Sequence, residues 1–90
     1  MFVYIMTNKN HTVLYVGVTN DIERRANEHK YHFDTDSFTA KYNVEQVVYL
    51  EEIADTFAAL EREKQLKRWS RAKKINLIEK QNPNRENYNR

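Results

Sequence analysis

The stretch LYVGVTNDIERRANEHK, residues 14–30, changes from a strand pattern to a helix pattern within a few residues. Its first part is rich in β-branched and aromatic residues, as strands are. Either Asn20 or Asp21 can cap the helix that follows, and Asn20 with Glu23 has the spacing of a capping box. The single glycine of the chain, Gly17, lies in the strand part, where a missing side chain leaves room for a ligand or another backbone.

Segments of the same two kinds make up most of the chain. Counting this unit, three segments have the composition of strands, residues 2–6, 12–18 and 44–52. Three have the periodicity of helices, residues 20–30, 56–69 and 71–80. A polar turn joins the first two strands as a hairpin, and Ser70 caps the last helix. This order predicts one α/β (α+β) domain over residues 1–80, with about three helices flanking a small three-stranded, largely antiparallel sheet. Residues 81–90 have little to bury, and we expect a flexible tail.

The composition excludes several classes of protein. Hydrophobic residues make up 40% of the 90 residues, which suits one folded domain, and no stretch approaches the roughly 20 apolar residues of a membrane span. Cysteine is absent, which excludes disulfides, thiolate zinc sites and a cysteine nucleophile. Because no signal-peptide pattern is visible, we expect a cytoplasmic protein without a membrane partner.

Charge is distributed unevenly along the chain. Residues 61–90 contain ten Lys and Arg against four Asp and Glu, whereas residues 1–60 contain five against nine. A basic half of this kind favours a phosphate-rich partner, although a solvated surface is the commoner meaning of a charge run. Glycine-rich phosphate loops are missing, so no nucleotide cofactor is expected.

Strand alternation separates an aliphatic face from an aromatic one. The aliphatic residues of the first two strands fall on one face and predict a core: Val3, Ile5, Leu14, Val16 and Val18. Tyr4, Tyr15 and Gly17 then share the opposite face. The two tyrosines are either ligand contacts or a cross-strand aromatic pair that stabilises the hairpin.

The helix over residues 20–30 presents Arg25 and His29 beside its buried side. With Ile22 and Ala26 buried, helical spacing places Arg25 and His29 at the border of the core, one turn apart, whereas Arg24 points away. An arginine at such a border can present its fork of donors to a phosphate. The alternative is a snorkelling arginine beside an ordinary border histidine.

Glu63 interrupts the apolar stripe of the helix over residues 56–69. It lies between Leu60 and Leu66, whereas Glu61 falls on a polar face. A carboxylate in that position is costly unless it is paired or binds a cation. Lys67 could pair with it, or Mg²⁺ could bind it. A weaker candidate is a zinc site built across the following loop by two histidines and two aspartates: His29, His32, Asp34 and Asp36.

In this order, the segments resemble the GIY-YIG nuclease superfamily and are most similar to its small single-domain URI/UPF0213-like group. FVYIM stands at the first signature, LYVG at the second, VTNDIERRANEH at the following helix and AALEREKQLKRWSRAKKINLI at the C-terminal helices. The resemblance covers residues 2 to about 80. Two positions depart from the first signature, because Phe2 replaces its glycine and Val3 its isoleucine.

The resemblance implies a divalent-metal-dependent endonuclease that hydrolyses DNA phosphodiester bonds with Mg²⁺ or Mn²⁺. Tyr4 and Tyr15 match the signature tyrosines, Arg25 the helix arginine, His29 a position held by histidine or tyrosine, and Glu63 the metal-binding glutamate. Tyr4 would then be the general base, Arg25 would stabilise the phosphate charge, and Tyr15 and His29 would position phosphate or water. Some members use a further asparagine, for which Asn76 or a tail asparagine is a candidate.

The basic C-terminal half would guide the nucleic-acid backbone into such a site. Its candidate contacts are Arg62, Lys64, Lys67, Arg68, Arg71, Lys73 and Lys74. A body of this size predicts structure-selective or weakly sequence-specific cutting. The alternative function is a non-catalytic module of the same fold that binds nucleic acid or docks a partner.

Overall fold

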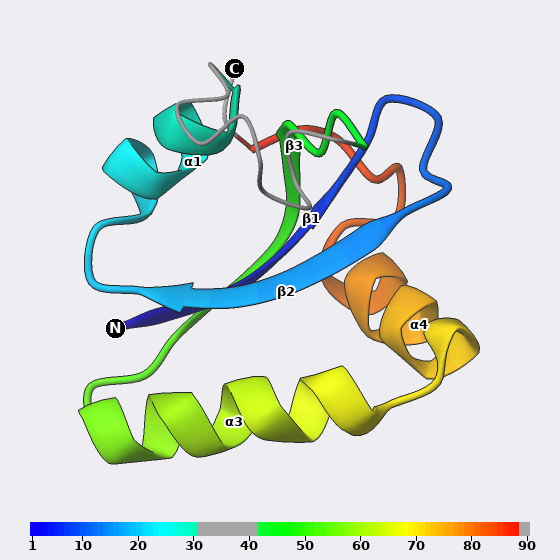
Figure 1. The fold of residues 1–90 in the computed structure, drawn as a ribbon. Helices are drawn as coiled ribbons and strands as arrows, with labels where there is room; N and C mark the ends of the chain where they lie inside the picture. Colours follow the sequence, from blue (N-terminus) through cyan, green and yellow to red (C-terminus); the bar gives the residue numbers. More distant parts are fainter. Residues whose placement is uncertain (31–41, 89–90) are drawn as a thin grey trace.

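The computed structural model describes residues 1–30 and 42–88, without the side chains of residues 29 and 30. Six elements follow one another in the predicted order (Figure 1): β1 (Phe2–Thr7), β2 (Leu14–Thr19), α1 (Ile22–Lys30), β3 (Gln46–Glu52), α3 (Thr56–Arg68) and α4 (Arg71–Gln81). The predicted α+β architecture is therefore confirmed. None of the helices within the described ranges is long and apolar enough to cross a membrane.

The three strands form one antiparallel sheet in the order β2-β1-β3. In the β1–β2 pair, Tyr4 stands opposite Gly17, and Met6 opposite Tyr15. The β1–β3 pair has an irregularity between Ile5 and Met6. The hairpin and the antiparallel sheet predicted from the sequence are both confirmed, and β1 becomes the central strand.

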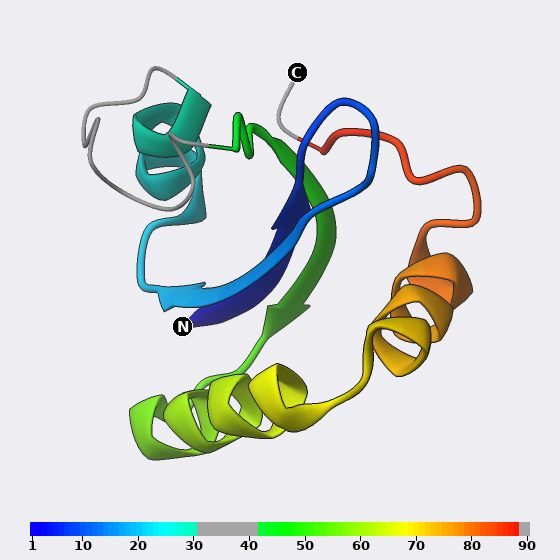
Figure 2. The same cartoon turned by 45° about the vertical axis from the view of Figure 1, so that its right-hand side comes forward.

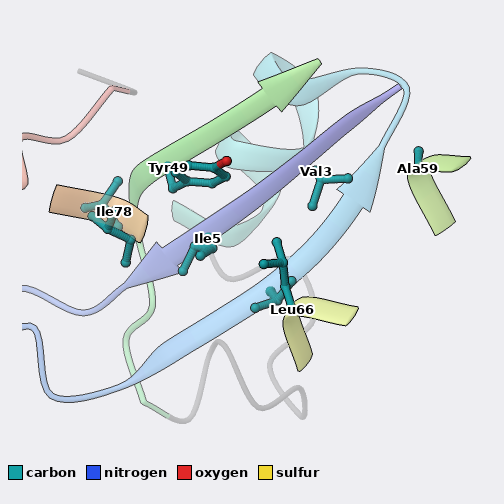
Figure 3. Close-up of a cluster of buried hydrophobic side chains, with 8 residues drawn as sticks. Val3, Ile5, Tyr49, Ala59, Leu66 and Ile78 are labelled. Carbon is teal, nitrogen blue, oxygen red and sulfur yellow. The ribbon is translucent and has the colours of Figure 1, made fainter. Parts of the chain in front are cut away.

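Helices cover both faces of the sheet, with α3 and α4 on one side and α1 on the other (Figure 2). The side under α3 and α4 is the larger core, and its buried side chains are Val3, Ile5, Val16, Val48, Tyr49, Ala59, Leu66 and Ile78. Figure 3 is a close-up of this cluster. Leu14 and Val18 pack against this cluster. The aliphatic face predicted from strand alternation is thus the core face.

The face under α1 carries the second, smaller core. Tyr4 and Met6 of β1 are buried there with Ala26 of α1, and Tyr15 packs against them. The tyrosines therefore lie on the opposite face from the aliphatic residues, as predicted. Because α1 and α3 cover different faces, side chains from both can meet only around an edge of this narrow sheet.

Side-chain caps fix where the helices begin. The carboxylate of Asp21 accepts a hydrogen bond from the backbone N–H of Arg24 at 3.1 Å, so α1 is capped at Asp21 rather than Asn20. Asp55 caps α3 through the N–H of Ala58 at 2.9 Å. Ser70 caps α4 as predicted. Each cap satisfies a backbone donor that the first turn of a helix leaves without a partner.

The end of α4 and the residue after it bind the outer edge of β3. The carboxamide of Gln81 accepts from the N–H of Leu50 at 3.0 Å and donates to its carbonyl at 2.7 Å. Asn82 is buried and donates to the carbonyl of Val48 at 3.1 Å. These amide groups therefore occupy positions that a neighbouring strand would fill.

The described part of the C-terminal tail continues along the same edge. The N–H of Val47 donates to the side chain of Asn87 at 3.0 Å, and its carbonyl accepts from the N–H of Tyr88 at 2.8 Å. We expected residues 81–90 to have little to bury and to fray. Through residue 88 the structure instead holds this segment against β3, because its polar groups replace the hydrogen bonds of a missing strand.

Candidate active site

Tyr4 and Arg25 meet on the α1 side of the sheet. Tyr4 is buried in the middle of β1, and the Nε of Arg25 donates a hydrogen bond to its hydroxyl oxygen at 3.4 Å. Arg24 instead lies 3.9 Å from Glu28 on the exposed side of α1. Helical spacing therefore predicted correctly that Arg25, and not Arg24, lies beside Tyr4.

Tyr15 completes an aromatic pair with Tyr4. The ring centroids are 6.4 Å apart and the ring planes are tilted by 39°. Arg25 is also hydrogen-bonded to the side chain of Tyr15, so the guanidinium contacts both phenols. The two interpretations of the tyrosines are therefore compatible. Tyr4 and Tyr15 form a cross-strand pair, and the same pair binds Arg25, a candidate ligand contact.

Gly17 makes room for Tyr4. A Cβ atom at position 17 would overlap Cζ and the hydroxyl of Tyr4. The sequence predicted space at this glycine for a ligand or a backbone. In the structure a side chain fills that space, because the phenol of Tyr4 crosses over the facing residue of β2.

Glu63 belongs to α3, on the other side of the sheet. Its side chain is 17% exposed, compared with 52% for Glu61, which confirms that Glu63 is the more enclosed carboxylate of the two. Its negative charge is the smallest of the contributions to the raised pKa of Tyr4. The Nζ of Lys67 lies 3.4 Å from its carboxylate, so the ion pair considered from the sequence is also present.

The electrostatics of this group keep Tyr4 protonated. Burial raises the pKa of Tyr4 above its ordinary value, the hydrogen bond from Arg25 lowers it in part, and the charges of Tyr15 and Glu63 raise it again. The pKa of Arg25 is raised chiefly by its hydrogen bond to Tyr4. The phenol of Tyr4 is therefore held in its neutral form, and additional positive charge would be needed for it to act as a base.

Glu63 is the candidate metal ligand in the part of the chain that the structure describes. Within residues 1–30 and 42–88, no group of three or more His, Asp or Glu could hold a metal ion. A single enclosed carboxylate suits Mg²⁺ or Mn²⁺, because Mg²⁺ keeps most of its water ligands and is bound by one or two carboxylates. Glu63 therefore meets the requirement in donor chemistry. The side chain of His29, and with it the zinc alternative through His32, Asp34 and Asp36, lies outside the described residues.

Two lysines of the predicted basic surface lie beside Glu63. Lys67 pairs with Glu63, and Lys64 lies 3.9 Å from Glu61 on the exposed side of α3. Both lysines are more than half exposed, so both can reach a bound anion.

Two other basic residues face a different flank of α3. The Nε of Arg62 lies 3.2 Å from Glu51 of β3, and its guanidinium stacks over Trp69 at 5.3 Å from the ring centroid. The Nζ of Lys73 lies 4.4 Å from the same centroid. The seven predicted residues are therefore not one surface, since Arg62 and Lys73 stabilise the junction of β3, α3 and α4.

The remaining three basic candidates divide in the same way. Arg71 donates to the backbone carbonyl of His11 at 2.8 Å and so holds the β1–β2 turn. Arg68 is exposed and Lys74 is half-buried. Helical spacing places Arg68 one turn after Lys64, so Lys64, Lys67 and Arg68 form the basic side of α3.

An open hollow of about 620 Å³ lies beside Arg25 and extends to the start of α3. Its lining includes Thr19, Asn20, Arg24, Arg25, Glu28 and Thr56. The sequence did not identify Thr56 as a site residue, and it placed Arg24 nearly opposite to the buried side of α1. The signal that could have found Thr56 is the cap at Asp55, which starts α3 there.

Comparisons with known proteins identify the family of this chain. The model of the GIY-YIG catalytic domain matches residues 1–76. This chain belongs to the GIY-YIG family. The GIY-YIG chain is also 40% identical over 88 residues to a UPF0213 protein of Syntrophus aciditrophicus (strain SB), covering 93% of this chain and 94% of that protein. No solved structure matches it significantly. The family match confirms the resemblance noted in the sequence and makes the chain a member of a nuclease superfamily.

Proposed function

We propose that this GIY-YIG protein is a divalent-metal-dependent endonuclease that hydrolyses DNA phosphodiester bonds. The observation that carries the proposal is the contact of Arg25 with the phenols of Tyr4 and Tyr15, beside which Glu63 is an enclosed carboxylate whose charge raises the pKa of Tyr4. Hydrolysis of a phosphodiester needs a group that takes the proton of water, a donor to the phosphate oxygens and an anchor for a cation. These residues have the chemistry for each task.

Each side chain would have a distinct part in the reaction. The guanidinium of Arg25 would turn from the phenols toward a non-bridging phosphate oxygen, where its donors stabilise the developing charge. In its phenolate form, Tyr4 would accept one proton from the attacking water, which leaves hydroxide to attack the phosphorus and Tyr4 as a neutral phenol. Tyr15 would position the phosphate through its hydroxyl. Glu63 would hold a divalent cation, whose positive charge would lower the pKa of Tyr4 and offset the charge of the phosphate.

Two glutamates on α3 allow a matched test. Glu63→Gln removes the proposed metal ligand, whereas Glu61→Gln removes an exposed carboxylate two residues away. The test is the nicking of labelled single-stranded, duplex and branched DNA, and of RNA, with Mg²⁺ or Mn²⁺. We expect Glu63→Gln to lower the rate by on the order of 100-fold or more, as loss of one charge-stabilising group does, and Glu61→Gln to leave it unchanged. Equal activity of the two variants would refute the metal role.

The alternative is a module that binds nucleic acid without cleaving it. The observation that favours it is the ion pair of Glu63 with Lys67, which satisfies the carboxylate without a cation. Such a module would show salt-sensitive nucleic-acid binding and no cleavage with any divalent metal, and its binding would be indifferent to Glu63→Gln. The nicking assay with the two glutamine variants therefore separates the two functions.

A further inference from the structure

Two apolar side chains on α3 remain exposed near the candidate active site. Phe57 is 71% exposed and Leu60 is 41% exposed, whereas Ala59 and Leu66 of the same helix are fully buried. Phe57 is the most exposed of the large hydrophobic side chains in the described residues. Since Phe57 and Leu60 are three residues apart, they are neighbours on the helix surface.

The surroundings of these side chains connect them to the site. Thr56, the residue before Phe57, lines the same hollow as Arg25. Leu60 lies one turn before Glu63 on α3, and Lys64 lies one turn after Leu60. Figure 1 shows the first turns of α3 near the end of β2 where α1 begins. The apolar pair thus belongs to the same first turns of α3 as a residue of the hollow, and Lys64 follows it by one turn.

We propose that Phe57 and Leu60 form a stacking platform for an unpaired nucleobase of the strand that is cut. The proposal rests on the proposed function and names its substrate class, which is nucleic acid with unpaired bases next to the scissile phosphate. Phe57 precedes Glu63 by six residues, which corresponds to roughly 9 Å along a helix. Stacked nucleotides advance about 3.4 Å each, so the stacked base lies about two or three nucleotides from that phosphate.

Charge and area favour a nucleobase over a protein as the occupant. A base stacks on an aromatic ring while its phosphates meet cations, and the exposed lysines 64 and 67 flank the pair. Two side chains offer far less than the area that a stable protein interface buries, which is about 800 Å² on each partner. In a fully paired duplex the bases are stacked on one another, so the platform would select single-stranded, gapped or branched substrates.

Binding without metal isolates the platform from the chemistry. The test is the affinity for a labelled 12-nucleotide DNA strand and for its duplex, measured by fluorescence anisotropy in EDTA. The wild-type chain is compared with Phe57→Ala, Phe57→Leu and Phe57→Trp. Because stacking is lost with the ring, we expect Phe57→Ala to bind the single strand on the order of 10-fold more weakly. Phe57→Leu should also weaken single-strand binding, and Phe57→Trp should retain it. The affinity of each variant for the duplex should change less than 2-fold.

Matched variants separate stacking from charge. Tyr88→Ala removes another exposed aromatic side chain, far from α3 on the outer edge of β3, and should leave single-strand affinity unchanged. Phe57→Ala should leave the slope of log K against log salt unchanged, whereas Lys64→Gln should reduce it by up to about one, as loss of a phosphate contact does.

Several results would overturn the platform. The platform is refuted if Phe57→Ala or Phe57→Leu binds the single strand as tightly as the wild-type chain does. It is also refuted if the wild-type chain does not bind the single strand. A dimer that Phe57→Ala dissociates in sedimentation would identify a second copy of the chain as the occupant. Ring-dependent binding without cleavage in Mg²⁺ or Mn²⁺ would keep the platform and refute the nuclease, so the two failures are distinguishable.

Discussion

Gly17 decides where the phenol of Tyr4 can lie. The two residues face each other across the β1–β2 pair, and the ring of Tyr4 occupies the volume that a Cβ at position 17 would take. Tyr4 then reaches Arg25 and comes under the influence of Glu63. Glycine is therefore needed at position 17 for a steric reason, because any side chain there would displace the ring of Tyr4 on the neighbouring strand.

Gly17→Ala should consequently displace the ring and weaken its hydrogen bond to Arg25. Because Tyr4 is buried and has little space to move, we expect a loss of about 1–3 kcal/mol in the free energy of unfolding, measured in urea. Nicking activity should fall as well. In a Tyr4→Leu background the clash is absent, so the same substitution should cost much less; an equal cost in both backgrounds would contradict the steric explanation.

Lys67 competes with a cation for Glu63. Its ammonium lies 3.4 Å from the carboxylate, and a helical pair of this spacing contributes about 0.2–0.5 kcal/mol. Lys67→Met should therefore tighten Mn²⁺ binding about 2-fold, measured by the loss of the free Mn²⁺ signal in electron paramagnetic resonance. Lys64→Met, which removes the partner of Glu61, is the control and should have no effect. Equal Mn²⁺ affinity in Lys67→Met and the wild-type chain would show that Glu63 is not a ligand.

Local periodicity predicted part of the candidate site and not the rest. It selected Arg25 over Arg24 and Glu63 over Glu61, because each choice depends only on which side of one helix is buried. It did not predict that Tyr4 fills the space at Gly17, because that contact depends on a ring crossing between strands. The catalytic roles of these residues stay predictions until cleavage is measured.

At the scale of elements, the outer edge of β3 is closed without a fourth strand. An open edge is a template for pairing with another chain. Here the carboxamides of Gln81, Asn82 and Asn87 and the backbone of Tyr88 bond to the groups that β3 leaves open. The strands and helices were predictable from composition and caps. The tail was not, because its polar sequence reads as a loop and its partners lie more than 30 residues away.

Asn82 is the most connected of these edge residues. Its side chain donates to the carbonyls of Val48 and Glu86 and accepts from the N–H of Glu86, all while buried. Asn82→Ala leaves a carbonyl of β3 without this donor, and we expect a loss of about 2 kcal/mol in the free energy of unfolding. Urea unfolding measures it.

Asn84→Ala is the control for that measurement, since Asn84 belongs to the same segment and is exposed. It should change stability by less than about 0.5 kcal/mol. If the two variants are equally stable, the tail does not contribute to the closing of the sheet.

At the scale of the whole molecule, the candidate site lies where two layers meet around one edge of the sheet. Arg25 comes from the layer above the sheet, Glu63 from the layer below it, and Tyr4 from the central strand. The sheet has only three strands, so an edge is close to its centre. A wider sheet would separate the two helices further, so the narrow sheet is what allows the charge of Glu63 to influence Tyr4 from the opposite layer.

Two buried tyrosines make the stability of the whole domain sensitive to alkaline pH. Burial raises the pKa of Tyr4, and burial with the hydrogen bond to Glu51 raises the pKa of Tyr49 to about 12. The hydroxyl of Tyr49 donates to that carboxylate at 2.6 Å. The folded chain therefore holds these protons more tightly than the unfolded chain, whose tyrosines titrate near pH 10.

The contribution of both tyrosines should be complete below about pH 10 and should be lost as the pH rises toward 12, with a slope of up to about 1.4 kcal/mol per pH unit for each group. Urea unfolding between pH 8 and 11.5 measures the slope. Tyr49→Phe should make the slope shallower, after a loss of about 1.5 kcal/mol at pH 8 from the missing hydrogen bond to a charged group. Tyr88→Phe, at an exposed tyrosine, is the matched control. A slope that Tyr49→Phe leaves unchanged would show that the phenol of Tyr49 is not held in its neutral form by the folded chain.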